Sequence, residues 1–584
     1  MRGRWHRQRD ARRIGRGGVV SDIDSRPEPA GQYDVLIVGG GASGLLSAIE
    51  LGRWGLRCLV IDDKQGPATH PQANANASRT MEHYRRLGFA AEFRETGLPA
   101  DYPTDVTYFT TFGGSEIARF RQPSRAEAVA IADSHESLRS WHTPELPHRA
   151  SQLFLEPILA EHARAQRSVD VRFDRRCVDI EVVGEQVSAV VEDTRTGEQS
   201  RVRGNWLLGC DGPRSMVRRH LGVSLTGKAG VVRDFLGGQM YSIYLRAPHF
   251  WRDIQPHRTW QHWSLAEGRR SILTAINGID TFSGHVQLAP GEEIEPEEAL
   301  ARVTRAFGRD TEVELISATK WTAGNHLIAE RYRSGRVILV GDAAHIFTPT
   351  GGMGYNTGVD DVANLAWKLA AVQQGWGSPG LLDTYESERR PMAERTMRFS
   401  TEVADSIGGM PVPANIDDPG AAGDQARAEL REKLLAHARF EYDIPGIQLG
   451  VRYTNSPITV PDGSPDTPDD PNVYLPTARP GARLPHFWLA DGHALFDRLG
   501  IGFTLLTTTG DADVEAFADA ARHAGIPLAI LDLGHEPEAK ILDAAAVLVR
   551  PDQHVAWRGD PAAVDAAAVL AVATGWSSPH STNS

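Results

Sequence analysis

The segment from residue 33 to residue 62 limits the folds open to this chain more than any other. Residues 33–39 (YDVLIVG) form an apolar run that ends in glycine, which is typical of a buried parallel strand. Residues 42–55 carry apolar side chains at helical spacing, and residues 57–61 (RCLVI) return to the strand pattern. The loop between the first strand and the helix reads GGGASG and contains the spacing GxGxxG. We therefore expect a strand–helix–strand unit that binds a dinucleotide.

The small and acidic residues of this unit each suit a pyrophosphate-bearing ligand. At Gly39, Gly41 and Gly44 the backbone can approach the phosphates closely, and the helix that begins near Ser43 directs its N-terminus at their negative charge. Asp62 ends the second strand, where a carboxylate accepts hydrogen bonds from ribose hydroxyls. With 57 glycines in 584 residues, a bare GxGxxG arises by chance about once in every two such chains. The prediction of dinucleotide binding therefore rests on the flanking strands and on Asp62.

Three later segments of the chain contain further motifs. Residues 335–370 (GRVILVGDAAHIFTPTGGMGYNTGVDDVANLAWKLA) contain a buried strand, a glycine-rich loop and a long helix. Residues 210–222 (CDGPRSMVRRHLG) contain an Asp-Gly pair, and residues 149–159 read RASQLFLEPIL. In these motifs and their order, residues 33–390 resemble the group A flavoprotein monooxygenases, the family of para-hydroxybenzoate hydroxylase, phenol hydroxylase and the polyketide aromatic hydroxylases. The resemblance implies FAD as the cofactor.

The resemblance also implies which residues contact FAD. Asp342 would bind a ribityl hydroxyl, and the glycines after it would let the helix at Asn356 direct its N-terminus at the pyrimidine end of the flavin. Asp211 would serve both FAD and the nicotinamide nucleotide. The full set of expected cofactor contacts is Gly39, Gly41, Ser43, Gly44, Asp62, Gln72, Gln152, Asp211, Gly341, Asp342, Gly351, Gly354 and Asn356.

Two positions depart from the family pattern. Many relatives carry an arginine at the position of Gln72, where it helps to bind FAD, and Arg79 is the candidate to compensate for it. The paired prolines that follow GDAAH in the family are here Thr348-Pro349. Pro349 is expected to present its carbonyl to the substrate, while the neighbouring proline contact is missing. His345 in the same segment is expected to be a packing residue.

By the same resemblance, the chain is expected to be an NAD(P)H-consuming monooxygenase that acts on paired donors and incorporates one oxygen atom of O₂. It would hydroxylate a phenolic or polyketide-like aromatic through a flavin C4a-hydroperoxide, and a base or proton relay would generate the phenolate. The candidates for catalytic roles are Pro349, Tyr241, His262 and Arg233, with Tyr244, His257, Trp260 and Trp263 as further members of an aromatic-rich segment. Packing is the alternative role for each residue of that segment.

Two other functions remain open on the same fold. The bound flavin could instead drive Baeyer–Villiger insertion or epoxidation, or the chain could be a flavin-binding protein that has lost turnover. A second GxGxxG occurs at residues 375–380 (GWGSPG), but it follows a helical segment and not a strand, so the sequence does not indicate the second Rossmann domain of the Baeyer–Villiger enzymes that have two. Residues 259–265 (TWQHWSL) also differ from the WxWxIP motif of flavin halogenases.

Composition narrows the range of partners. The net charge of −13 argues against a general nucleic-acid-binding protein, because phosphate binding needs a basic surface. Three cysteines without metal-ligand spacing indicate neither a disulfide framework nor a metal site, and they favour a reducing, cytoplasmic location. The sequence contains no run of about 18 apolar residues that would suit a membrane span. The expected partner is a small aromatic substrate, and a homodimer stays open.

The expected fold is α/β: a Rossmann-type FAD-binding domain, an interleaved mixed-sheet substrate domain and a C-terminal thioredoxin-like α/β domain. The tail resembles the thioredoxin-like domain of phenol hydroxylase relatives, and because it has no cysteine its role would be structural or in dimer contacts. Residues 169–173, 178–183 and 187–192 are expected to form a small antiparallel set. The expected boundaries are 1–30 for a disordered basic arm, 31–226 and 326–410 for the two parts of the FAD-binding domain, 227–325 for the substrate sheet, 411–474 for a helical segment and linker, and 475–584 for the tail domain without CxxC.

Overall fold

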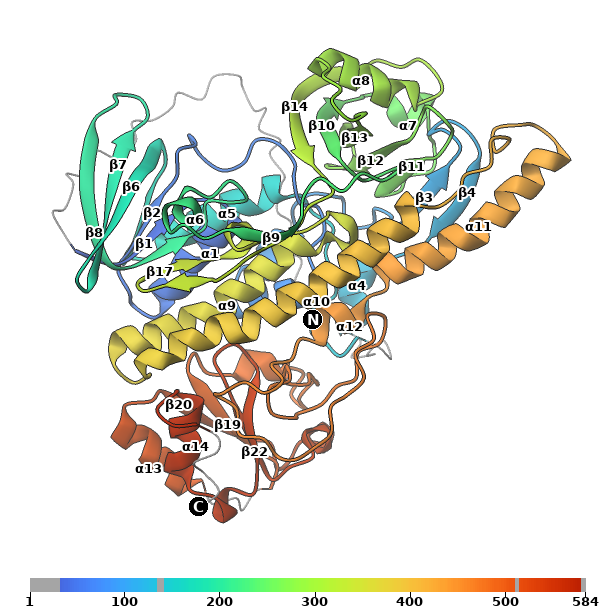
Figure 1. Ribbon diagram of the computed structural model, residues 1–584. Coiled ribbons are helices and arrows are strands. Elements are labelled where there is room, and N and C mark those ends of the chain that lie inside the picture. The colour runs from blue at the N-terminus through green and yellow to red at the C-terminus, as the bar shows by residue number, and fades with distance from the viewer. Residues whose placement is uncertain (1–31, 134–140, 510–513, 579–584) are drawn as a thin grey trace, which may run out of the picture. The chain divides into compact units, whose positions relative to one another are not determined.

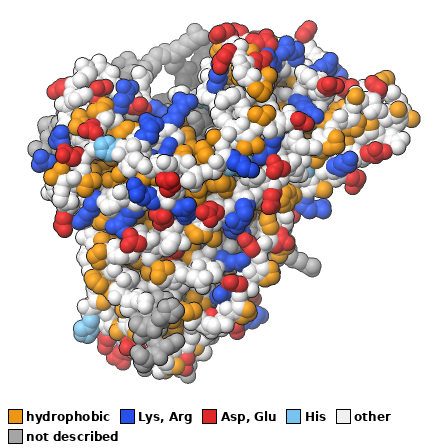
Figure 2. All heavy atoms as spheres, in the orientation of Figure 1, with side chains coloured by type: hydrophobic (Ala, Val, Ile, Leu, Met, Phe, Trp, Pro, Cys, Tyr) orange, Lys and Arg blue, Asp and Glu red, His pale blue; other side chains and the backbone are white. Residues whose placement is uncertain are grey.

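The computed structural model describes residues 32–133, 141–509 and 514–578 (Figure 1). Tyr33–Ser584 forms one compact unit, and every contact given below lies within it. The basic arm expected at residues 1–30 lies outside the described residues. Acidic, basic and apolar side chains are interspersed on the face shown in Figure 2, as is usual on the surface of a globular protein.

The centre of the unit is a mixed eight-stranded sheet whose middle strands are parallel. Its main path is β16 (Arg333–Ser334), β17 (Val337–Leu339), β8 (Gln199–Gly209), β1 (Tyr33–Val38), β2 (Cys58–Ile61) and β5 (Val169–Arg172). The last five of these strands run parallel to one another. Val35, Leu36 and Ile37 of β1 are fully buried, which agrees with their position in the middle of a parallel sheet.

Helix α1 (Ala42–Arg53) connects β1 to β2, which confirms the strand–helix–strand unit expected from the sequence. It packs against α5 (Gln152–Ala165) and α9 (Met353–Gln374). Helix α9 in turn contacts α2 (Ser78–Leu87) and α10 (Asp383–Gly408). Segments that are far apart in the chain thus share one hydrophobic core.

Two strands extend the central sheet from β8 as an antiparallel ribbon, namely β7 (Gln186–Asp193) and β6 (Arg175–Val183). The expectation that residues 169–173 belong to this antiparallel set is wrong, because β5 pairs in parallel with β2. A four-residue strand carries too little pattern to specify its partner.

A second sheet has seven strands and is covered on one side by α7 (Phe250–Asp253) and α8 (Pro296–Arg305). Its first five strands belong to the expected substrate domain, but the last two come from residues 106–120. The expected boundary at residue 227 does not anticipate this, because the pairing of β3 with β11 joins distant segments. The order is β14 (Glu314–Thr322), β10 (Gln239–Arg246), β13 (Thr281–Gln287), β12 (Ser271–Ala275), β11 (Gln261–Ser264), β3 (Val106–Phe109) and β4 (Glu116–Phe120).

The tail contains a mixed four-stranded sheet with helices, as the expected α/β class requires. Its order is β20 (Leu528–Asp532), β19 (Phe503–Thr507), β21 (Ala546–Val549) and β22 (Val555–Gly559), with α13 (Glu515–Ala524) and α14 (Ala566–Ala573). The connecting elements are α3 (Ala90–Arg94), α4 (Arg125–Asp133), α6 (Met216–His220), α11 (Ala421–Tyr442), α12 (Pro445–Leu449) and a small sheet of β18 (His345–Ile346), β15 (His326–Ala329) and β9 (Leu225–Lys228).

Candidate active site

Three strands of the central sheet end side by side at one edge. Val38 of β1 and Leu339 of β17 both pair in parallel with Gly209 of β8. The carboxyl ends of these parallel strands therefore lie at the same edge, where open α/β sheets bind their ligands. The loops that follow the strands are called the edge loops here, and they are residues 39–44, 210–218 and 341–358.

The first two edge loops approach each other so closely that only glycine fits at two positions. Gly39 has a φ of +107°, and a Cβ there would overlap the carbonyl oxygen of Cys210. A Cβ at Gly44 would overlap the carbonyl oxygen of Gly39. At Gly41, by contrast, a Cβ would meet Glu156 Oε1 at an ordinary 3.7 Å. Protein packing thus explains the glycines at 39 and 44, while the one at 41 leaves room for a ligand to approach the backbone.

The first and third edge loops meet at Ser43. Gly341 has a φ of +61°, and a Cβ there would lie 2.8 Å from Ser43 Oγ. A Cβ at Gly358, in α9, would lie 3.0 Å from the same oxygen. The two glycine-rich segments that the sequence sets almost 300 residues apart are therefore in direct contact, as a single shared cofactor requires.

Two helices begin at this edge without a side-chain cap. Helix α1 starts after Gly41 and α9 starts after Gly352, and neither N-terminus receives a hydrogen bond from a capping side chain. Gly351 and Gly352 both have left-handed φ values, +74° and +66°, and Gly354 lies in the first turn of α9. An uncapped helix N-terminus offers free N–H groups and a partial positive charge, which together bind anions.

Two acidic residues flank the first edge loop in fixed positions. Asp62 is 8% exposed; its Oδ2 accepts from the Gly40 N–H at 2.5 Å and its Oδ1 from the Lys64 N–H at 2.8 Å. Glu156 accepts from the Ala68 N–H at 2.6 Å and from the side-chain amide of Gln152. These bonds hold the Asp62 carboxylate at the end of β2, where a ribose would lie in a dinucleotide fold.

Asp342 has an environment unlike that of the other acidic residues at the edge. Its side chain is open to solvent, and it makes no hydrogen bond or ion pair with any described residue. The protein atoms around it nevertheless withdraw enough water to raise its pKa, against the lowering effect of nearby His345. A carboxylate that is partly desolvated and yet exposed remains available for a ligand's hydroxyl groups.

The carboxylate of Asp211 accepts hydrogen bonds from within its own loop. Its Oδ1 accepts from the Ser215 hydroxyl at 2.5 Å and its Oδ2 from the Val217 N–H at 3.0 Å, so that it helps to begin α6. Arg218 donates to the carbonyl oxygens of Ala343 at 2.9 Å and Pro213 at 2.9 Å. The second and third edge loops are therefore joined through Arg218.

Asn356 joins α9 to the start of α2. Its Oδ1 accepts from the Ala77 N–H at 2.8 Å and the Thr80 hydroxyl at 2.7 Å, and its amide donates to Gly352 O at 2.6 Å. Gln72 is exposed and has no partner among the described residues. Arg79, the candidate to compensate for the missing arginine, is 2% exposed, and its guanidinium is bound to Glu82 and to the tail domain.

His345 is a buried residue of the third edge loop, as expected for a packing residue. It is fully buried, its Nε2 contacts Asp361 Oδ2 at 2.6 Å, and its ring stacks on Phe347. Asp361 also accepts from Arg389 at 2.8 Å and from the Gly341 N–H at 3.3 Å. This buried group fixes the backbone from which Asp342 projects.

One side of the seven-stranded sheet contacts the segment between β2 and α2. Residues paired across neighbouring strands point to the same side of a sheet. Ser242, His285, Ile272, Trp263 and Tyr108 are such a row. The Ser242 hydroxyl contacts His70 Nε2 at 2.9 Å, and His70 follows Asp62 in the chain. We call this the loop side and the opposite one the helix side.

Tyr241 and His262 lie on the helix side. The Tyr241 hydroxyl donates to Ile294 O at 3.2 Å. His262 is fully buried among Phe109, Phe112, Phe250 and Trp251, and this burial lowers its pKa to about 3. Each of the two neighbours a loop-side residue in its strand and therefore points to the opposite side of the sheet. Their expected roles on the substrate stay predictions that would require the substrate to reach the helix side.

The other two catalytic candidates lie in different places. Arg233 donates to Asp405 Oδ1 at 2.6 Å and contacts His326 Nε2 at 3.4 Å, which ties the start of the sheet domain to α10 and β15. Pro349 is exposed within the third edge loop, between Asp342 and Gly351. Of the four candidates, only Pro349 belongs to an edge loop.

Three residues on the loop side were not singled out from the sequence. Tyr108 Oη, His285 Nδ1 and Trp321 Nε1 are buried polar atoms without a hydrogen-bond partner among the described residues, and Trp321 pairs with Met240 on this side. Buried polar atoms are nearly always hydrogen-bonded in native proteins, so these three suit a polar ligand. The strand alternation that includes Tyr244 and Trp263 would have indicated them, had the pairing of the strands been known.

Other candidate features lie away from this site or are missing from the described residues. A hollow of about 1100 Å³ lies between β4, α4 and residues 256–258, and His257 is the one residue considered for the site that lines it. The described helices include none that is long and apolar enough to cross a membrane. Within the same residues, no group of three or more potential ligands is placed to hold a metal ion.

Comparisons with known proteins agree with this arrangement. Residues 32–400 match the model of the FAD binding domain family, and residues 477–579 match that of the aromatic-ring hydroxylase C-terminal domain. The chain is 31% identical to 2,4-dichlorophenol 6-monooxygenase of Cupriavidus pinatubonensis, over 92% of this chain and 95% of that protein. It is 30% identical to tetracenomycin A2 monooxygenase-dioxygenase of Streptomyces glaucescens, again over 92% and 95%.

A solved structure extends the likeness to the whole fold. The rebeccamycin biosynthetic enzyme RebC with reduced flavin shares 33% identity and a TM-score of 0.84, over 94% of this chain and 99% of that one. The first family model matches more than half of the chain and takes in all three edge loops. The resemblance drawn from the motifs is confirmed: the chain belongs to the FAD-dependent aromatic-ring hydroxylases, a family of flavoprotein monooxygenases.

Proposed function

We propose that this protein consumes NAD(P)H and O₂ to hydroxylate a phenolic or polyketide-like aromatic compound. The aromatic would bind between the edge loops and the loop side of the seven-stranded sheet. The observation that carries the proposal is the Asp342 carboxylate, unpartnered among the described residues, beside two uncapped helix N-termini. The named substrates of the two relatives, a dichlorophenol and a tetracenomycin, support the substrate class.

Different residues of the edge loops suit different parts of an FAD molecule. The N-terminus of α1 and the open backbone at Gly41 suit the pyrophosphate, and Asp62 suits a ribose. Asp342 suits the ribityl hydroxyls, and the N-terminus of α9 stabilises negative charge at the pyrimidine end of the flavin. When bound, FAD would supply the redox chemistry, taking a hydride from NAD(P)H and activating O₂ so that one oxygen atom enters the substrate.

The loop side of the sheet fits a planar, partly polar substrate. Trp263 and Tyr108 lie with ring centroids 5.7 Å apart, and His285 and Trp321 lie 5.9 Å apart. Burial lowers the pKa of His285 to about 4, so its unpartnered Nδ1 can accept a hydrogen bond from a substrate hydroxyl at neutral pH. The Trp321 N–H is a donor, and the Tyr108 hydroxyl can act either way. We assign substrate positioning to these three residues and keep Pro349 as the edge-loop contact.

Nothing in the arrangement of the described residues favours Baeyer–Villiger insertion, epoxidation or loss of turnover over hydroxylation. The three free thiols fit a reducing compartment, and we propose a cytoplasmic location.

The proposal is tested with purified protein reconstituted with FAD. Oxidation of NADH and of NADPH is followed at 340 nm with a panel of phenols and polycyclic aromatic polyketides, and hydrogen peroxide is measured in parallel. We expect one nicotinamide nucleotide to be favoured and its oxidation to rise with at least one aromatic compound without an equal rise in peroxide. A protein that retains no FAD after reconstitution contradicts the proposal.

A further inference from the structure

A hairpin tip of the tail domain is buried against the cofactor domain. Residues 550–554 join β21 to β22, and such tips ordinarily lie in solvent. Here Arg550, Asp552, Gln553 and His554 are each 3% exposed or less. Gln553 has a φ of +63°, a left-handed conformation that a non-glycine residue keeps only where its surroundings determine it.

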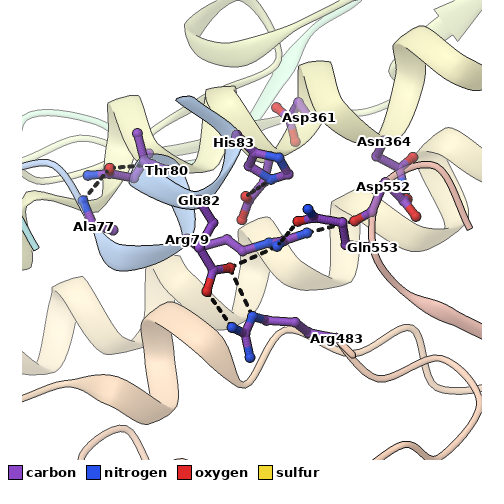
Figure 3. A network of polar contacts seen from close by, with 12 residues as sticks. Ala77, Arg79, Thr80, Glu82, His83, Asp361, Asn364, Arg483, Asp552 and Gln553 are labelled. Atoms are coloured by element: carbon purple, nitrogen blue, oxygen red, sulfur yellow. Dashed lines mark hydrogen bonds and ion pairs between the residues drawn. The ribbon is translucent and has the colours of Figure 1, made fainter. Parts of the chain in front are cut away.

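The tip holds the first turn of α2 through one arginine. Arg79 donates to Gln553 Oε1 at 2.7 Å and to Asp552 O at 2.6 Å, and it pairs with Glu82 at 2.9 Å (Figure 3). Glu82 is also paired with Arg483 of the tail segment. Figure 3 shows these side chains converging between α2 and the tail, with the tip residues on one side of the Arg79 guanidinium.

The same tip is bound to α9 and α10. Arg550 donates to both carboxylate oxygens of Glu388, at 2.6 Å and 2.9 Å, and pairs with Asp552 at 2.6 Å. Glu388, in α10, also accepts from Lys368 and Asn364 of α9 at 2.6 Å and 2.7 Å. All of these side chains are buried. A buried ion network is not a strong source of stability, but it fits one arrangement of the helices and penalises others.

The contact reaches the cofactor site through α2. Thr80, next to Arg79 in the chain, donates to Asn356 Oδ1 at 2.7 Å, and the Ala77 N–H donates to the same oxygen. Asn356 lies in the first turn of α9. The first turn of α2 is thus bonded to the hairpin tip on one side and to the N-terminus of α9 on the other.

We propose that the hairpin tip, residues 550–554, is a positioning element of the flavin site. By fixing Arg79 it sets the place of α2, and through Thr80 and Asn356 it aligns the N-terminus of α9 with the pyrimidine end of the flavin. This inference rests on the proposed function, which places the flavin there. The tail domain then acts in catalysis without touching the reacting atoms.

The test compares holoenzyme variants at one position. Gln553→Asn suits the left-handed backbone better than glutamine does, but its amide is one methylene too short to reach Arg79. Gln553→Glu keeps an acceptor of the original length. We expect Gln553→Asn to raise the dissociation constant of FAD about tenfold, shift the visible flavin spectrum and increase the share of NAD(P)H that ends as peroxide. Gln553→Glu should leave the FAD dissociation constant, the flavin spectrum and the share of peroxide near their wild-type values.

A matched control separates positioning from general destabilisation. Asp565 caps α14 in the same domain by accepting from the N–H groups of Ala567 and Ala568, so Asp565→Ala should lower the melting temperature without changing FAD affinity or coupling. The inference is overturned if Gln553→Asn behaves as wild type, or if Asp565→Ala changes the flavin properties equally. Failure of the proposed function looks different, because then the wild-type protein itself shows no FAD-dependent, aromatic-stimulated oxidation.

Discussion

Asp342 differs from the other acidic residues in and around the edge loops in having no partner among the described residues. Asp62 is bound by two backbone N–H groups, Asp211 caps α6, and Asp361 is paired with His345 and Arg389. These three shape the protein, while Asp342 is held over a buried group and left free. The sequence predicts Asp342 through its motif, and the structure adds that its carboxylate has no partner among the described residues.

This difference predicts an unusual variant. Asp342→Ala should raise the dissociation constant of FAD roughly tenfold or more, because a charged acceptor for the ribityl hydroxyls is lost. The apo protein should be no less stable, since the substitution removes a desolvated charge without breaking any bond. FAD titration by fluorescence and thermal unfolding of the apo form measure the two effects. Asp310→Ala, at an exposed position, is the control, and an unchanged FAD affinity for Asp342→Ala would refute the role.

At the scale of elements, the sequence gives the loops more reliably than the faces of the sheet. Gly39, Gly44 and Gly341 are readable because steric requirements of the backbone allow few other residues. The side to which Tyr241 and His262 point depends on how β10 and β11 pair and on which side α7 and α8 pack, and none of this is local. The Gln553–Arg79 contact could not be predicted from the sequence either, because it joins residues far apart in the chain.

The assignment of the two sides predicts opposite outcomes for two substitutions to phenylalanine. Tyr108→Phe, on the loop side, should raise KM for the aromatic substrate about fivefold to tenfold through the loss of one hydrogen bond. His262→Phe, on the helix side, should keep kcat/KM within about twofold, because a neutral buried ring is replaced by another ring of similar size. Steady-state measurement of kcat and KM for both variants tests this assignment of the two sides. An inactive but folded and FAD-loaded His262→Phe protein would mean that the helix side takes part in chemistry.

At the scale of the whole molecule, many ionisable groups are buried in one protonation state. Burial keeps His262 neutral, with a pKa of about 3. Burial alone would raise the pKa of Glu388, but the charges of Arg550 and Lys368 lower it well below its usual range. The folded protein therefore resists protonation at both kinds of site, while the unfolded chain does not.

Stability should consequently fall as the pH is lowered. Below about pH 6.5 the unfolded chain protonates histidines such as His262 that stay neutral in the folded state, so the unfolded state binds more protons. Below about pH 4.5 the unfolded chain also protonates carboxylates such as Glu388 that remain charged in the folded state, which adds to the loss. Thermal unfolding between pH 8 and pH 4 should show a melting temperature that decreases toward acid. A flat or rising profile would contradict the buried protonation states.

We propose that the three edge loops form one FAD site and that one oxygen atom enters an aromatic compound bound at the loop side of the sheet. The most direct measurement is turnover of an aromatic substrate from the active panel under ¹⁸O₂, with the product analysed by mass spectrometry. We expect one ¹⁸O atom in each hydroxylated product molecule and one NAD(P)H consumed for each. A product that carries no ¹⁸O, or NAD(P)H oxidation that yields only peroxide with every aromatic compound, would contradict it.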